Sequence, residues 1–276
     1  MNIKKLKLSA FFAAVLALVA LITLTASTYA WFTFRTYTNV TPVSGTVSRG
    51  EGDLLIANSP NGIFDTACDL IVRDPDAELL PVTTADLRSF FSVSAQDSLG
   101  MATAYAAADD RAQDHTLNGT LYLKAEGGGF DVYLWLPSVD CGGDVQTLAA
   151  MRLGLLIETR NGTSVTVMKL DELADTSGAA VRRTIPVPGS VVSGIDEAGT
   201  PVYVPDPAVS LSDCAAQGTE DDVQPGRVSV CSMATDEVAT VHFWLWLEGC
   251  DDNCMNSAQG RDVALQFGFA GVQNGL

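Results

Sequence analysis

The sequence predicts an all-β protein, an antiparallel β-sandwich of the jelly-roll type with a few short helices. Three observations predict it. Apolar residues alternate with period two in several segments, glycine- and asparagine-rich turns separate these segments, and no long helical pattern alternates with them. Short strands at close spacing are typical of sandwiches and jelly rolls, whereas a parallel α/β fold needs a helix between successive strands.

The clearest strands come in two pairs and two single segments. Residues 121–125 and 130–136 flank Gly127-Gly128-Gly129, which predicts a hairpin. Residues 152–159 and 164–170 flank Asn161-Gly162, a strong short-range hairpin signal. Residues 241–247 and 263–269 also alternate, and they predict two strands near the C-terminus.

Helical and irregular segments are few. Thr84 is a candidate N-cap for a short helix reaching about Phe91, and a second short helix is expected at residues 145–150. Residues 187–225 are rich in Pro, Gly, Ser and Asp and predict a loop-rich insertion. We therefore expect residues 31–276 to form a single domain.

The N-terminus has the composition of an export signal, an apolar helix preceding the domain. Lys4, Lys5 and Lys7 come before an uncharged apolar run that extends to Phe34, and Thr28-Tyr29-Ala30 offers small residues for cleavage between Ala30 and Trp31. The alternative is an uncleaved membrane anchor, since the run is long enough to span a bilayer. Either reading places the remaining chain outside the cell, secreted or tethered through residues 1–30, with a signal peptidase as a partner if the signal is cleaved.

The charge balance restricts the partners. The chain has 16 Lys and Arg against 33 Asp and Glu, and removal of residues 1–30 changes the net charge from −17 to −20 because that segment holds three lysines and no acid. Such a surface repels phosphate backbones, which excludes nucleic acid as a partner. With 47% hydrophobic residues the chain can still bury a substantial core.

Six cysteines in an exported chain suggest disulfides. Six thiols allow fifteen pairings; proximity suggests Cys250 with Cys254 and Cys214 with Cys231, and elimination leaves Cys68 with Cys141. The acidic run between Cys250 and Cys254 is also a possible metal loop, but it lacks the ligand spacing of zinc and calcium sites. A disulfide-closed turn is the favoured reading, and no metal or cofactor is expected.

The sequence gives little sign of catalysis. The two histidines, His115 and His242, lie far apart in the sequence, and no nucleophile elbow, zinc-binding helix motif or phosphate-binding loop is present. We expect no enzyme; a secreted hydrolase with a triad assembled in space is the alternative. His242, Trp244 and Trp246 share one face of a strand, where they either pack as a second core layer, the favoured reading, or form an exposed platform for a carbohydrate or protein ligand.

Both ends of the chain resemble a known group. The run Ser27-Thr28-Tyr29-Ala30-Trp31-Phe32-Thr33 with Val43-Ser44-Gly45-Thr46-Val47, and the C-terminal run Phe243 to Gly249, resemble TasA-like and camelysin-type exported proteins of Gram-positive bacteria. The resemblance implies a jelly-roll fold, release by a dedicated signal peptidase and, as in some members, assembly into biofilm matrix fibres. The six cysteines and the segment 187–225 fall outside it.

The mature N-terminus has the pattern of a strand that could link subunits. Its alternating residues, Phe32, Phe34, Thr36, Thr38 and Val40, can complete the open sheet edge of a neighbour, or else the strand packs on its own domain. The sequence therefore predicts an exported, non-catalytic structural protein of the cell surface or biofilm matrix that self-associates or binds other surface proteins. The alternative is a tethered surface module that binds a glycan or protein ligand.

Overall fold

A computed structural model describes residues 52–74, 78–97, 100, 102–141, 145–171, 189–217, 224–254 and 263–274. The predicted signal, its cleavage site at Ala30 and Trp31, and the candidate linking strand lie outside these residues. Within them the chain is mostly β-strand with short helices, and most strand pairs are antiparallel, as predicted.

The larger sheet has six strands, ordered β1 (Asp53–Ala57), β5 (Leu117–Glu126), β14 (Val238–Leu247), β7 (Met151–Thr159), β8 (Gly162–Lys169) and β11 (Val209–Ser210). All neighbours are antiparallel except β11, which runs parallel to β8. β14 is central, because it pairs along its length with both β5 and β7.

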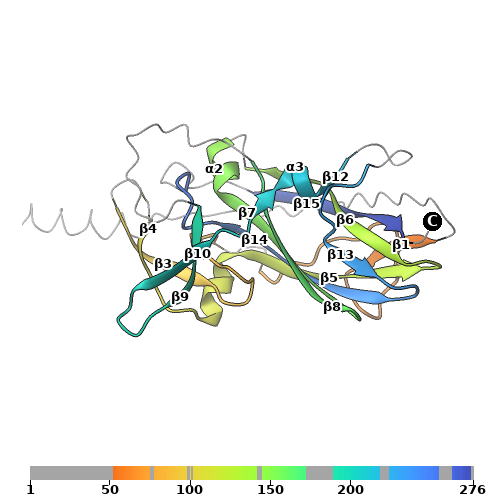
Figure 1. The fold of residues 1–276 in the computed structure, drawn as a ribbon, viewed down its shortest axis with the longest axis horizontal. Coiled ribbons are helices and arrows are strands. Elements are labelled where there is room, and N and C mark those ends of the chain that lie inside the picture. Colours follow the sequence, from red (N-terminus) through yellow and green to blue (C-terminus); the bar gives the residue numbers. More distant parts are fainter. Residues whose placement is uncertain are drawn as a thin grey trace, which may run out of the picture.

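The second sheet is organised around β6 (Phe130–Asp140), which pairs with β15 (Ala264–Gln273), β13 (Cys231–Met233) and β12 (Ala215–Ala216). Inward residues of both sheets form one apolar core, with β5, β7 and β14 contributing from one side and β6 and β15 from the other. Period-two alternation puts Phe243 of β14 against Phe267 of β15, with ring centroids 5.4 Å apart. Figure 1 shows the β6 and β15 layer lying over the six-stranded sheet.

Smaller elements gather at one end of the molecule (Figure 1). They are a three-stranded sheet of β2 (Val82–Thr83), β3 (Phe91–Gln96) and β4 (Ala102–Tyr105), and the hairpin of β9 (Ser190–Ile195) and β10 (Pro201–Pro205). The helices are η1 (Asp110–His115, a 3-10 helix), α2 (Val145–Ala150) and α3 (Leu211–Cys214). A second apolar cluster, which includes Phe90, Trp244 and Trp246, covers the outer face of the six-stranded sheet.

The hairpin predicted across Gly127-Gly128-Gly129 is wrong. β5 and β6 are consecutive strands, but they belong to different sheets. β5 already pairs with β1 on one side and β14 on the other, so no edge is left for β6. The glycines instead carry the chain from one sheet to the other: Gly127 has a φ of 75°, and a Cβ at Gly128 would lie 2.4 Å from the side chain of Gln273.

The other local predictions had mixed outcomes. The hairpin of β7 and β8 is confirmed, with Thr159 paired with Gly162, and the helix at Val145–Ala150 is confirmed. The helix predicted after Thr84 is wrong: Thr84 Oγ1 does accept a hydrogen bond from the Leu87 amide at 3.0 Å, but Leu87 has a φ of 57° and the chain bends into β3.

The segment 187–225 is more regular than predicted. Its described residues contain the β9–β10 hairpin, β11, α3 and β12. Because β11 pairs with β8 and β12 pairs with β6, this segment joins both sheets.

Candidate functional site

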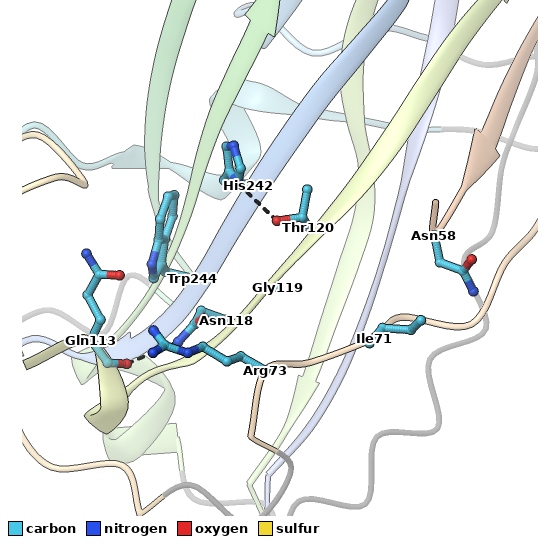
Figure 2. Close-up of a pocket in the computed structure, with 9 residues that line it drawn as sticks. All are labelled: Asn58, Ile71, Arg73, Gln113, Asn118, Gly119, Thr120, His242 and Trp244. Atoms are coloured by element: carbon cyan, nitrogen blue, oxygen red, sulfur yellow. Dashed lines mark hydrogen bonds between the residues drawn. The ribbon is translucent and has the colours of Figure 1, made fainter. Parts of the chain in front are cut away.

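An open recess on the outer face of β5 and β14 is the candidate site. Its volume is about 430 Å³, and Figure 2 shows the residues that line it: Asn58, Ile71, Arg73, Gln113, Asn118, Gly119, Thr120, His242 and Trp244. They come from two sheet strands, the 3-10 helix η1 and the connection between β1 and β2, so the fold brings together residues that are distant in the sequence.

Strand register sets one wall of the recess. In the β5–β14 pair, His242 lies opposite Thr120 and Trp244 lies opposite Asn118. Alternation sends Phe243 into the core and its two neighbours to the outer face. Thr120 Oγ1 lies 3.0 Å from His242 Nδ1, and this hydrogen bond fixes the orientation of the imidazole (Figure 2).

A close backbone approach forms the opposite wall. Val72 makes a β-bridge with Gly119, and the Arg73 amide donates to the Asn118 carbonyl at 2.8 Å. A Cβ on Gly119 would lie 2.3 Å from the Ile71 carbonyl oxygen, so only glycine lets the chain cross here. Ile71 itself is 58% exposed beside the recess.

Two polar side chains of the recess, Asn118 and Arg73, interact with residues in or next to η1. The Asn118 amide nitrogen donates to the carbonyls of Gln113 and Thr116 and to Thr116 Oγ1, at 3.0 to 3.2 Å, which ties β5 to the end of η1. Arg73 forms an ion pair with Asp114, 3.7 Å between Nη2 and Oδ1, and both side chains are largely exposed. The guanidinium therefore remains accessible to a ligand.

The predicted patch of His242, Trp244 and Trp246 is divided by the structure. His242 and Trp244 line the recess, whereas Trp246 is fully buried and donates its indole N–H to Glu248 Oε2 at 3.1 Å. Phe90 packs against both indoles, with ring centroids 5.9 Å from Trp244 and 6.1 Å from Trp246. The favoured interpretation, a second layer of core packing, is confirmed for these two rings, and a platform that includes Trp246 is wrong.

A buried charge network lies beyond Trp246 on the same face. Arg152 Nη2 donates to Asp251 Oδ2 at 2.6 Å and to Asp206 Oδ2 at 3.4 Å, and Arg152 Nη1 donates to the carbonyls of Ala149 and Met151. Burial alone would lower the pKa of Arg152, but the neighbouring carboxylates raise it above its ordinary value. The network thus fastens the chain after β10 and the turn after β14 to β7.

Glu248 sits in this network with its carboxylate out of water. Oε1 accepts from the Cys250 amide at 3.0 Å, and the side chain is 2% exposed. Burial raises the pKa of Glu248 to about 7, although Arg152 and the hydroxyl of Thr83 favour the charged form. The carboxyl group therefore changes charge near neutral pH.

All six cysteines are described, and each carries a thiol in the structure. Burial raises the pKa of Cys231 and Cys250 to about 12. Cys250 Sγ lies 3.1 Å from the Tyr105 hydroxyl, in an apolar cluster separate from the main core that contains Cys254. The three disulfide pairings of Cys250 with Cys254, Cys214 with Cys231 and Cys68 with Cys141 stay predictions.

The described residues lack the features of two other kinds of site. They contain no group of three or more His, Cys, Asp or Glu side chains placed to hold a metal ion. Nor does any helix among them have the length and hydropathy needed to cross a membrane. His115, the second histidine, ends η1 and does not line the recess.

Comparison of the chain with models of protein families, with curated proteins and with solved structures found no match in any of the three. The residues of the recess other than His242 and Trp244 were missed from sequence. Asn118-Gly119-Thr120 is the one local signal, because a glycine inside an alternating strand marks a place where another backbone segment approaches closely.

Proposed function

We propose that the protein is an exported, non-catalytic structural component of the cell surface or extracellular biofilm matrix, and that its two-sheet body is a jelly roll. Three features support export to the cell surface or matrix. They are the apolar N-terminal segment preceded by lysines, the acidic mature chain and the resemblance to TasA-like proteins. The two packed sheets support a body that acts through shape and contact.

One observation carries the assembly part of the proposal. β15 is ten residues long, and its partner is β6; apart from Gln266, its other edge faces no strand that the structure describes. A long strand with an unpaired edge offers a row of main-chain donors and acceptors to another strand. Leu265, Phe267 and Phe269 anchor β15 in the core, so the edge is held rigidly in place.

The mature N-terminus has the complementary pattern. In residues 31–42, Phe32 and Phe34 alternate with polar residues, and Pro42 follows the alternating run. We propose that this segment of one copy adds to the β15 edge of the next, where main-chain hydrogen bonds supply affinity and the phenyl rings supply specificity. Head-to-tail repetition of this contact generates a fibre.

The test compares the secreted chain beginning at Trp31 with a variant that lacks residues 31–42. Electron microscopy and light scattering across a concentration series are expected to show fibres for the full chain and single particles for the variant. A synthetic peptide of residues 31–42 should bind the variant, and a peptide of the same composition without the alternation should not. Single particles for both chains would contradict the proposal.

The recess supports a second candidate function, a surface module that binds a glycan ligand. Its volume of about 430 Å³ lies within the range of about 300–1,000 Å³ that is typical of ligand sites, and polar side chains converge on it beside an indole. Trp244→Ala is expected to abolish binding on a glycan array. Tyr122→Ala is the matched control, since Tyr122 lies on β5 outside the recess. Equal binding by both variants and the parent chain would contradict this function.

A further inference from the structure

The recess differs in charge from the protein that surrounds it. The chain carries 33 acidic residues against 16 basic ones, yet none of the nine lining residues is acidic. Arg73 contributes a guanidinium, and Asn58, Gln113 and Asn118 contribute amides. Asp114 pairs with Arg73 at the recess, but the lining itself has no carboxylate, and such a lining on a strongly acidic protein is suited to a ligand that carries negative charge.

The Arg73 guanidinium is a donor in the recess, whereas Asn118 already uses its amide nitrogen on Gln113 and Thr116 and therefore offers its carbonyl oxygen as an acceptor. Guanidinium and indole N–H groups can only donate, and amides donate as well as accept. Figure 2 shows His242 and Trp244 side by side on β14, with Gln113, Asn118 and Arg73 gathered near them. A ligand that complements this arrangement is rich in acceptors and also has hydroxyl groups for the amides.

Arg73 is available for an incoming anion. Its ion pair with Asp114 spans 3.7 Å, longer than a hydrogen bond, and the two side chains are 61% and 55% exposed. Exposed pairs of this kind contribute about 0–1 kcal/mol, so a ligand carboxylate can replace Asp114 at small cost. A bidentate guanidinium–carboxylate pair would then fix the orientation of the ligand.

The aromatic geometry argues against a neutral sugar. A sugar that stacks on an aromatic ring needs an exposed ring face, but Trp244 is 9% exposed because Phe90 packs against it. A phosphate is also a poorer fit, since phosphate sites usually combine several donors from backbone N–H groups or clustered cations, and this recess has one guanidinium. One cation with several amides matches a single carboxylate on a hydroxylated ring.

We infer that the recess binds a carboxylated sugar, a hexuronate unit of an acidic polysaccharide, with Arg73 pairing with the carboxylate and the side-chain amide of Gln113 taking ring hydroxyls. This inference rests on the second candidate function and names its ligand class.

Calorimetric titration of the mature protein with a diuronate, and with a neutral disaccharide of the same linkage, tests the inference. The diuronate is expected to bind and to weaken as salt rises from 50 to about 300 mM, because ion pairs at exposed sites are screened. Arg73→Gln should lower its affinity about two- to fivefold, because an exposed guanidinium–carboxylate pair contributes up to about 1 kcal/mol. Arg227→Gln is the matched control: Arg227 pairs with Asp213 at 3.2 Å and is 84% exposed, away from the recess.

The outcomes distinguish the uronate inference from the glycan-binding function on which it rests. Equal affinity for the neutral disaccharide, or equal diuronate affinity of the two arginine variants, overturns the uronate inference and leaves a glycan-binding function standing. Failure of both sugars to bind overturns the inference together with the binding function. Because Arg73 is exposed, the unfolding temperature of Arg73→Gln should match that of the parent chain, so lost binding cannot be attributed to misfolding.

Discussion

The two faces of the six-stranded sheet are built on different principles. β14 supplies both: Val241, Phe243 and Leu245 enter the core between the sheets, while His242, Trp244 and Trp246 face the opposite side. The inner face is uniformly apolar. The outer face combines buried indoles with a buried charge network and the recess, so the two faces of one strand meet different surroundings.

The two faces show what the alternating sequence of a strand can specify. On the inner face, an apolar side chain needs only close packing with its neighbours. On the outer face, a large side chain with polar atoms also needs a hydrogen-bond partner. Trp246 has Glu248, and His242 has Thr120. The outer face therefore places the stricter requirement on which residues lie next to each other. The inner face contributes more to the stability of the fold.

The largest effect is expected from the inner face. Phe243→Ala should lower the free energy of unfolding by about 3–5 kcal/mol, because it leaves a cavity against Phe267 in a closed core. Urea denaturation followed by tryptophan fluorescence measures the change. A loss below about 1 kcal/mol would mean that the two sheets do not pack as described.

The charge network should make stability depend on pH. The pKa of Glu248 is raised from 4.5 to about 7, so the folded state holds its proton more tightly than the unfolded state does. The stabilisation is complete below about pH 4.5 and is lost as pH rises toward 7, an effect of about 3 kcal/mol. Glu248→Gln should remove this dependence, and its stability relative to the parent should increase by that amount between pH 4.5 and 7.5. Parallel stability curves for the two proteins would contradict the prediction.

The wall of the recess should be sensitive to a single methyl group. Gly119→Ala places a Cβ 2.3 Å from the Ile71 carbonyl and 2.7 Å from the Phe243 ring, and it should cost about 1–3 kcal/mol in chemical denaturation. Gly194→Ala in β9 is the matched control, since its Cβ would meet only Val202 at 4.0 Å. Equal stability of the two variants would show that residues 71–73 do not cross β5 closely.

The smallest effect is expected at the exposed rim. Arg73→Ala should change the free energy of unfolding by less than about 0.5 kcal/mol, because its ion pair with Asp114 is solvated. Thermal unfolding at low and high salt measures this. A larger loss would indicate that Arg73 is a structural residue rather than one available for binding.

Much of the fold was predictable because strand periodicity is local. The alternating residues of β14 and β15, and the Asn161-Gly162 turn, carry their signals within a few positions. Strand partners do not: nothing near Gly127 indicates that β14 occupies the edge of β5 that a hairpin would need. His242 and Trp244 were found because they alternate with core residues along β14. Arg73 lies in an irregular connection and Gln113 in a short 3-10 helix, and the position of both depends on the tertiary fold.

The pairing of β6 with β15 has a consequence for how the chain folds. β6 lies at the middle of the sequence, and its longest partner is β15, the last described strand. β5 likewise pairs with β14, which comes much later in the chain. Sheets that depend on such distant partners fold slowly, since the chain loses entropy before these contacts form. A newly made polypeptide therefore cannot complete either sheet until nearly all of it has been synthesised.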